Sequence, residues 1–299
     1  MNEINLSNLI CAKIESLGAT DAGAYFGVSS RTVRNWAEGK NSPPAHAAQL
    51  VLDEYMKLAP CAADDSKGKV QILLPVYRTL NGKTHFTLFA NYRNYGPDRL
   101  SIIPCFNTLI VEARSILAEQ ALKTESEWFL FIDDDMILPF GNAAGLKWLG
   151  ANIPDPNAAH AAIARIMSHS AEYKILSGLY YSKNSKHNGI NSNCVNSEIE
   201  TAKYQKHFLL GGDMGVVETA WTGFGFTRVH RSVFENMIEN IATLPEIKPY
   251  SNGRHHGFFN QYGPDYSEDA SFCLRAKKLG IKSYIDTGLI VGHSGEYIY

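Results

Sequence analysis

The sequence WFLFIDDD, at positions Trp128–Asp135, joins a run of apolar residues to three adjacent carboxylates. Short runs of bulky apolar residues are typical of strands that are buried on both faces, as in parallel sheets. The C-terminal ends of such strands form the rim at which open α/β sheets bind ligands. Alternate side chains of an extended chain point the same way, so Asp133 and Asp135 can direct oxygens at one hard cation. A solvated acidic loop or a helix N-terminus is the alternative interpretation.

The composition sets bounds on the class of protein. At 299 residues with 45% hydrophobic content, the chain is long enough for one large domain, or for a large and a small one. Its net charge of −2 gives no overall attraction to nucleic acid, so such binding requires a local basic patch. The five cysteines are odd in number and far apart, which argues against a disulfide framework or a zinc site. Without a transmembrane-length apolar run or a secretion signal, we expect a cytoplasmic protein with no membrane partner.

The pattern of residues predicts two units joined by a linker. Residues 1–58 are predicted to be helical, because apolar residues recur at helical spacing up to Gly18 and Ser29 or Ser30 can cap a further helix. Residues 59–69 are small and polar without periodicity, which is typical of a linker. Residues 70–299 open with the apolar run Val70–Leu74 and predict an α/β domain.

The stretch Ala22–Trp36 resembles a helix-turn-helix of the Cro and repressor type. The resemblance implies a DNA-binding face on the recognition helix, formed by Arg31, Thr32, Arg34 and Asn35. Residues 1–58 carry five basic and six acidic residues, so we expect weak and salt-dependent DNA binding unless dimerisation or the second domain adds contacts. A helical module for protein contacts is the alternative, and a homodimer is left open.

Five further stretches lie before and after the aspartate triplet along the chain. They are Pro75-Val76-Tyr77, the segment from Asn107 to Arg114, the glycine-rich aromatic segment from Ala220 to Phe226, the pair Glu268-Asp269, and His293. Together they resemble the nucleotide-sugar-dependent glycosyltransferases of the GT-A fold, over roughly residues 70–299. The resemblance implies a Rossmann-like α/β fold, with a mostly parallel sheet flanked by helices.

The same resemblance implies a role for each residue. A divalent metal would be held by Asp133, Asp135 and His293, with Mg²⁺ or Mn²⁺ favoured by oxygen ligands and Mn²⁺ by the imidazole. Glu268 and Asp269 would be the catalytic pair, in which Asp269 takes the proton from the acceptor hydroxyl. Contacts to the donor are implied for Pro75, Val76, Tyr77, Arg114, Asp133, Asp134 and Gly223. A solvated helix charge remains the alternative for Arg114, a helix cap for the catalytic pair, and a structural role for His293.

Several elements of the second unit are predicted from local patterns. We expect helices over residues 108–123, 139–149, 158–167 and 270–279, a helix capped by Ser232, and strands over residues 173–181 and 283–286. On the first of these helices, Leu109 and Ile116 are expected on the buried side. Residues 182–212 are polar and predict an irregular loop that binds the acceptor or closes the site. An insertion over residues 244–263 is expected on the acceptor side through Tyr250, Arg254, His255, His256, Phe258, Phe259 and Tyr262.

These features together predict a metal-dependent inverting glycosyltransferase that moves a sugar from a nucleoside-diphosphate sugar to a hydroxyl, with UDP-glucose as the first donor to consider. A DNA-binding module raises the local concentration of DNA, so the expected acceptor is a hydroxymethylated pyrimidine, as in DNA-modifying enzymes of bacteriophages acting in the host cytoplasm. Two alternatives stay open. One is a transferase for a polysaccharide, protein or lipid-linked acceptor, with a helical module for assembly or autoregulation. The other is a non-enzymatic DNA-binding regulator.

Overall fold

The computed structural model describes residues 6–41, 47, 68–77, 82–138, 162–180, 194–196, 215–244, 247 and 255–293. Its helices are α1 (Leu6–Phe26), α2 (Ser30–Ala37), α4 (Gly82–Tyr95), α5 (Ile110–Leu122), α7 (Ala162–Ser168), α8 (Arg231–Glu239) and α9 (Glu268–Lys278). Its strands are β1 (Val70–Val76), β2 (Leu100–Phe106), β3 (Trp128–Ile132), β4 (Met136–Ile137), β5 (Ile175–Leu179), β6 (Cys194–Asn196), β7 (Val216–Thr222), β8 (Phe226–His230), β9 (Ser283–Ile290) and β10 (Gly292–His293).

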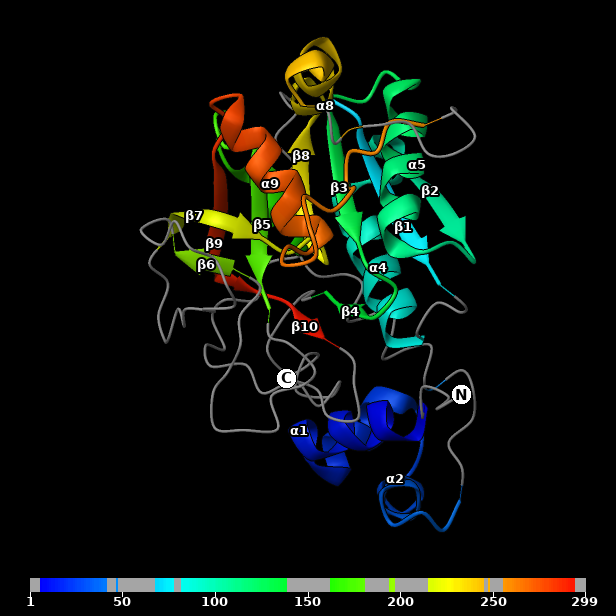
Figure 1. The fold of residues 1–299 in the computed structure, drawn as a ribbon. Helices are drawn as coiled ribbons and strands as arrows, with labels where there is room; N and C mark the ends of the chain where they lie inside the picture. Colours follow the sequence, from blue (N-terminus) through cyan, green and yellow to red (C-terminus); the bar gives the residue numbers. More distant parts are fainter. Residues whose placement is uncertain are drawn as a thin grey trace.

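A mixed central sheet organises these elements, in the strand order β2-β1-β3-β8-β5-β9-β7-β6 (Figure 1). Strands β1, β2 and β3 run parallel to one another, as do β5 and β9. Strands β7 and β8 run antiparallel to their neighbours, so six strands share one direction and two oppose it. The predicted α/β class, with a mostly parallel sheet flanked by helices, is confirmed.

Strand β3 is buried on both faces, as its apolar run predicts. Trp128, Leu130 and Ile132 pack into a core that includes residues of α4 and α7. Phe129 and Phe131 point the other way, into a second core that includes residues of α5, α8 and α9. Because both faces of the strand are covered, its direction and register are fixed, and Asp133 leaves it at a defined point.

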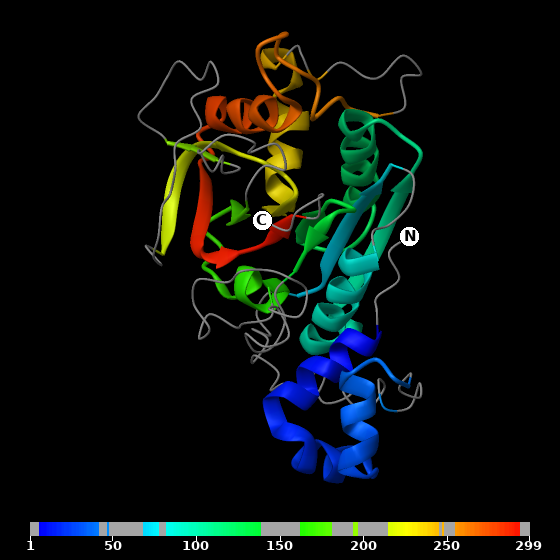
Figure 2. The same ribbon diagram turned by 90° about the horizontal axis from the view of Figure 1, so that it is seen from below.

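Helices α1 and α2 pack against each other at one end of the molecule (Figures 1 and 2). Helix α1 is interrupted at Gly18, which has φ 76° and ψ 157°, as the predicted helix end requires. Ser29 caps α2 by accepting a hydrogen bond from the Thr32 amide at 3.1 Å, which confirms the predicted cap. Val33 and Trp36 are buried in a small separate core of this helix pair.

Four local predictions are corrected. The α8 cap is His230, whose ring accepts a hydrogen bond from the Ser232 amide, so Ser232 lies inside the helix. Leu109 precedes α5 and is 69% exposed, while Ile116 is only partly buried. The strand β6 lies within the stretch predicted as an irregular loop, where it pairs with β7.

The fourth correction concerns the aromatic insertion. Phe258 and Phe259 are buried core residues that pack with Phe234 and Phe272, so they do not face an acceptor. His256 contacts Glu119 of α5. The predicted helix over residues 139–149, most of the predicted linker, and Tyr250 and Arg254 of the insertion lie outside the described residues. Among the helices that the structure describes, none combines the length and apolarity needed to cross a bilayer.

Candidate active site

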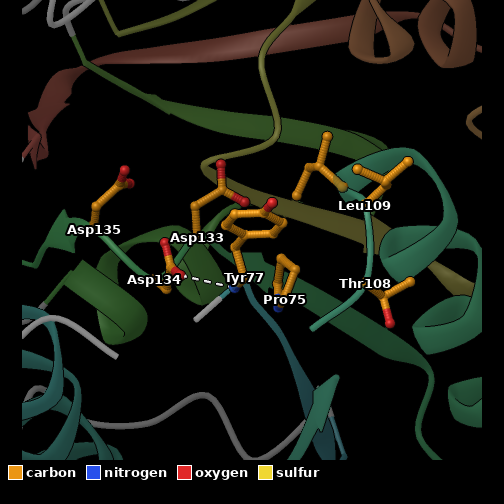
Figure 3. Close-up of a pocket in the computed structure, with 8 residues that line it drawn as sticks. Pro75, Tyr77, Thr108, Leu109, Asp133, Asp134 and Asp135 are labelled. Atoms are coloured by element: carbon orange, nitrogen blue, oxygen red, sulfur yellow. Dashed lines mark hydrogen bonds between the residues drawn. The ribbon is translucent and has the colours of Figure 1, made fainter. Parts of the chain in front are cut away.

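The aspartate triplet lies at the ends of β1 and β3, and its backbone position is fixed by β8. The Asp133 amide donates a hydrogen bond to the Gly225 carbonyl at 2.9 Å, just before β8 begins. Asp134 turns towards β1, where its Oδ2 accepts a hydrogen bond from the Tyr77 amide at 3.0 Å (Figure 3). Residues 134 and 135 form a turn in which the Met136 amide donates to the Asp133 carbonyl at 3.2 Å, so the predicted extended alternation does not continue past β3.

A cavity of about 330 Å³ opens beside the triplet. It is lined by Pro75, Tyr77, Thr108, Leu109, Ile110, Asp133, Asp134 and Asp135 (Figure 3). One part of the lining is apolar and outward-facing, since Tyr77 is 55% and Leu109 is 69% exposed. The other part carries three carboxylates, and none of these lining residues is basic. The cavity therefore combines a surface suited to a flat apolar group with one that attracts cations.

Arg114 is buried behind this cavity and binds carboxylates from two other segments. Its Nη2 donates to the two oxygens of Asp133, at 3.0 and 2.9 Å. Its Nη1 donates to Glu268 at 3.2 Å and also to Asp269. This burial excludes a solvated helix charge, and the hydrogen bonds of the guanidinium go to carboxylates of the site. Burial alone would lower the pKa of Arg114, but the neighbouring carboxylates outweigh it and keep the group charged.

Asp269 lies in the first turn of α9, but Ser267 caps that helix. Its Oδ1 accepts from Arg114, and its Oδ2 accepts from the Phe224 amide at 3.2 Å. Burial raises the pKa of Asp269 to about 7; Glu268 and Asp133 act in the same sense, while Arg114 opposes them. A carboxylate whose pKa lies near neutral pH is well matched to proton transfer in either direction.

Asp135 and His293 come together from distant parts of the chain. Strand β10 pairs with β4, which places His293 Nε2 at 3.3 Å from Asp135 Oδ1. Asp133 is directed at Arg114, and in the described part of the chain no three His, Cys, Asp or Glu side chains form a metal-holding group. Of the three predicted ligands, the structure thus pairs only Asp135 with His293. Asp135 and His293 thus bring together one oxygen and one nitrogen donor, ligand types that Mn²⁺ accepts.

One residue of this site, Tyr180, was missed by sequence reasoning. Tyr180 follows β5, and its hydroxyl accepts a hydrogen bond from the Gly225 amide at 2.8 Å. Its ring contacts His293 edge-on, with centroids 5.8 Å apart. A Cβ atom on Gly225 would lie 2.9 Å from Tyr180 and 3.0 Å from Met136, so any other residue there would have to displace these side chains. The glycine-rich stretch was a signal for close packing, but nothing in the sequence linked it to Tyr180.

The remaining predicted site residues differ in how far they are buried. Pro75 and Tyr77 line the cavity, whereas Val76 is buried in the sheet. Gly223 is buried, and its carbonyl accepts a hydrogen bond from Thr227 at 2.8 Å, so it lies beneath the site. On α2, Arg31 and Arg34 are exposed, and Thr32 and Asn35 are partly exposed.

No protein-family model and no curated protein matches this chain. Among solved structures, the crystal structure of A197 from STIV is 13% identical with a TM-score of 0.44, over 76% of this chain and 86% of that chain. UDP-glucose pyrophosphorylase complexed with UDP-glucose is 11% identical with a TM-score of 0.35, over 73% and 72% of the two chains. Apo UDP-glucose pyrophosphorylase is 12% identical with a TM-score of 0.33, over 73% of each chain. Similarities of this size transfer no activity or ligand.

Proposed function

We propose that residues 70–299 form a GT-A-type inverting glycosyltransferase that depends on a divalent metal and uses a nucleoside-diphosphate sugar. The supporting observation is the acidic cavity, whose Asp133 is joined through Arg114 to the partly buried Asp269. Among the lining residues that the structure describes none is positively charged, so we expect such a ligand to require a cation as its countercharge. Asp135 and His293 would hold that cation. When bound, it offsets the negative charge that develops on the departing diphosphate.

Asp269 is the general base of the proposed reaction. Its carboxylate takes the proton of the acceptor hydroxyl while that oxygen forms a bond to the anomeric carbon of the sugar. The bond between this carbon and the diphosphate oxygen breaks in the same step, and the nucleoside diphosphate leaves. A single displacement of this kind inverts the configuration. The exposed Tyr77 and Leu109 supply the surface against which the nucleobase packs.

The proposal is tested by incubating the protein with nucleotide sugars and acceptors. UDP-glucose is the first donor, followed by other UDP-, GDP- and ADP-sugars, each with Mn²⁺ or with EDTA. Acceptors are plain and hydroxymethylated DNA oligonucleotides, a polysaccharide and water. We expect release of the nucleoside diphosphate and mass gain of one acceptor, both requiring Mn²⁺. If no donor gives either release of the nucleoside diphosphate or metal-dependent binding, the proposal is contradicted.

We further propose that the acceptor is DNA and that the unit over residues 1–58 delivers it. The observations in support are a capped α2 and the exposed Arg31 and Arg34 along it. Phosphate contacts by these two groups would hold a duplex near the catalytic domain. The proposed acceptor hydroxyl is that of a hydroxymethylated pyrimidine, because unmodified DNA presents no primary hydroxyl within the chain.

Replacing both Arg31 and Arg34 with Ala is expected to weaken binding to long duplexes and to flatten its salt dependence. Each lost phosphate contact removes about one unit from the slope of log affinity against log salt concentration. Transfer to a short hydroxymethylated oligonucleotide at saturation should stay close to normal, as it should after removal of residues 1–69. Lys277→Ala with Lys282→Ala removes the same charge from exposed positions of the second unit and is the control. Equal duplex binding by all variants would assign the helices to assembly or regulation.

A further inference from the structure

Arg114 joins three segments of the chain that are far apart in sequence. It is carried by α5, and its partners are Asp133 after β3 and the pair Glu268-Asp269 at the start of α9. The bonds to α9 span more than 150 positions of sequence. One guanidinium thus lies among three carboxylates, of which Asp133 belongs to the cavity and Asp269 is the proposed base.

The geometry holds the Asp269 carboxylate at both of its oxygens. Arg114 donates to Oδ1, and the backbone amide of Phe224 donates to Oδ2 at 3.2 Å. The guanidinium is itself confined, since it lies 5.9 Å from the ring centroids of both Phe224 and Phe259. A planar group with two donor nitrogens in a fixed fork can hold two carboxylates in one orientation, which a flexible ammonium cannot.

A second buried arginine shows the ordinary structural use of this side chain. Arg228 of β8 lies over the Trp128 ring at 4.5 Å and donates to the backbone carbonyls of His169, Ser170 and Tyr173. It therefore fastens a turn to the sheet and contacts no carboxylate in the described part of the chain. Arg114 differs because it donates its hydrogen bonds to carboxylate side chains of the site.

We propose that Arg114 is a positioning residue, which fixes the Asp269 carboxylate for proton removal and ties it to Asp133 at the donor cavity. The inference rests on the proposed function and assigns Arg114 a role other than contact with the donor diphosphate. Because one guanidinium holds both acids, the position of the base is set from the side of the cavity where the donor binds. Loosening this link displaces the base without removing any group that touches the donor.

The test compares Arg114→Lys with Arg228→Lys, two charge-conserving changes at buried arginines. Arg114→Lys is expected to lower kcat by about 10- to 100-fold, because small displacements of a catalytic group carry penalties of that order. Donor KM should stay within about threefold of normal, because the change removes no group that contacts the bound donor. Arg228→Lys should lower thermal stability and leave kcat unchanged. A raised KM at normal kcat for Arg114→Lys would make Arg114 a donor ligand and overturn the proposal, and so would unchanged kinetics.

A readout without substrate separates this proposal from the proposed function. In protein labelled with ¹⁵N-phenylalanine, the Phe224 amide is identified as the resonance that moves in Asp269→Asn. It should also move in Arg114→Lys and stay in place in Arg228→Lys. An unmoved Phe224 amide in Arg114→Lys would overturn the positioning role even if the chain proves to transfer no sugar. Should that variant fail to fold, Arg114→Met with Asp133→Asn and Glu268→Gln removes the cation together with two of its acids, and the same resonance decides.

Discussion

Replacement of Asp269 by asparagine is expected to lower turnover by at least about 100-fold, because a general base typically contributes about 10²- to 10⁴-fold. The amide keeps the size of the side chain and its contact with the Phe224 amide, but it cannot accept the acceptor proton. Binding of donor with Mn²⁺ should stay close to normal, since Asp269 does not line the cavity. Steady-state kinetics and calorimetric titration with the nucleotide measure the two effects separately.

The matched control is Asp265→Asn, which changes an exposed carboxylate shortly before α9. It should leave turnover and binding unchanged. Near-normal turnover in Asp269→Asn would reduce this residue to a partner of Arg114 and require another base.

The pH dependence follows from the same residue. Transfer requires the ionised carboxylate, and the pKa of Asp269 is raised to about 7 by burial and by the carboxylates around it. The ionised fraction therefore falls as the pH drops below neutral, and kcat of the unchanged protein should rise between about pH 6 and pH 8. The residual activity of Asp269→Asn should lose this rise, and persistence of the rise would assign the titration to another group.

Asp135→Ala is expected to abolish Mn²⁺-dependent binding of the nucleoside diphosphate. None of the described residues that line the cavity is basic, so a diphosphate left without its cation meets the carboxylates of that lining. His293 alone supplies one nitrogen ligand, which is too few to hold the metal against competition from water. Calorimetric titration with nucleotide in Mn²⁺ and in EDTA measures the effect, and Asp265→Ala serves as the control.

The fold should survive this change, because the Asp135 side chain is only partly buried. Its ion pair with His293 Nε2 is long, at 3.3 Å, and its loss should cost little stability. The melting temperature in EDTA should therefore shift little. Unchanged Mn²⁺-dependent affinity in Asp135→Ala would remove the metal from the proposed mechanism.

Strong local signals in the sequence predicted much of this structure. The apolar run before Asp133 indicated a strand covered on both faces, and Ser29 or Ser30 could be recognised as a cap from its neighbours. The position of Glu268 and Asp269 at a helix start was likewise local information. Each of these features depends on residues within one turn or one strand, which is why sequence patterns suffice for them.

The partners of Arg114 could not be predicted in that way. Its nearest acidic partner is 19 positions away in sequence, and the others are more than 150 positions away, so no local pattern brings them together. The same limit applies to Tyr180 and to the pairing of Asp135 with His293. The prediction for Phe258 and Phe259 was wrong because aromatic side chains occur both on stacking surfaces and in cores. Only their packing against α9 shows that these two lie in the core.

The antiparallel β8 has a consequence for how this site can be dissected. Because β8 starts where β3 ends, the main chain of residues 223–225 reaches the site and supplies the Phe224 amide to Asp269 and the Gly225 carbonyl to Asp133. Side-chain substitution leaves these groups in place, so a scan with alanine would record this segment as inert or merely structural. Replacing the Phe224 amide by an ester, through semisynthesis or an α-hydroxy acid, would delete this one N–H donor. It would measure a main-chain contribution to the site that no substitution among the encoded side chains removes.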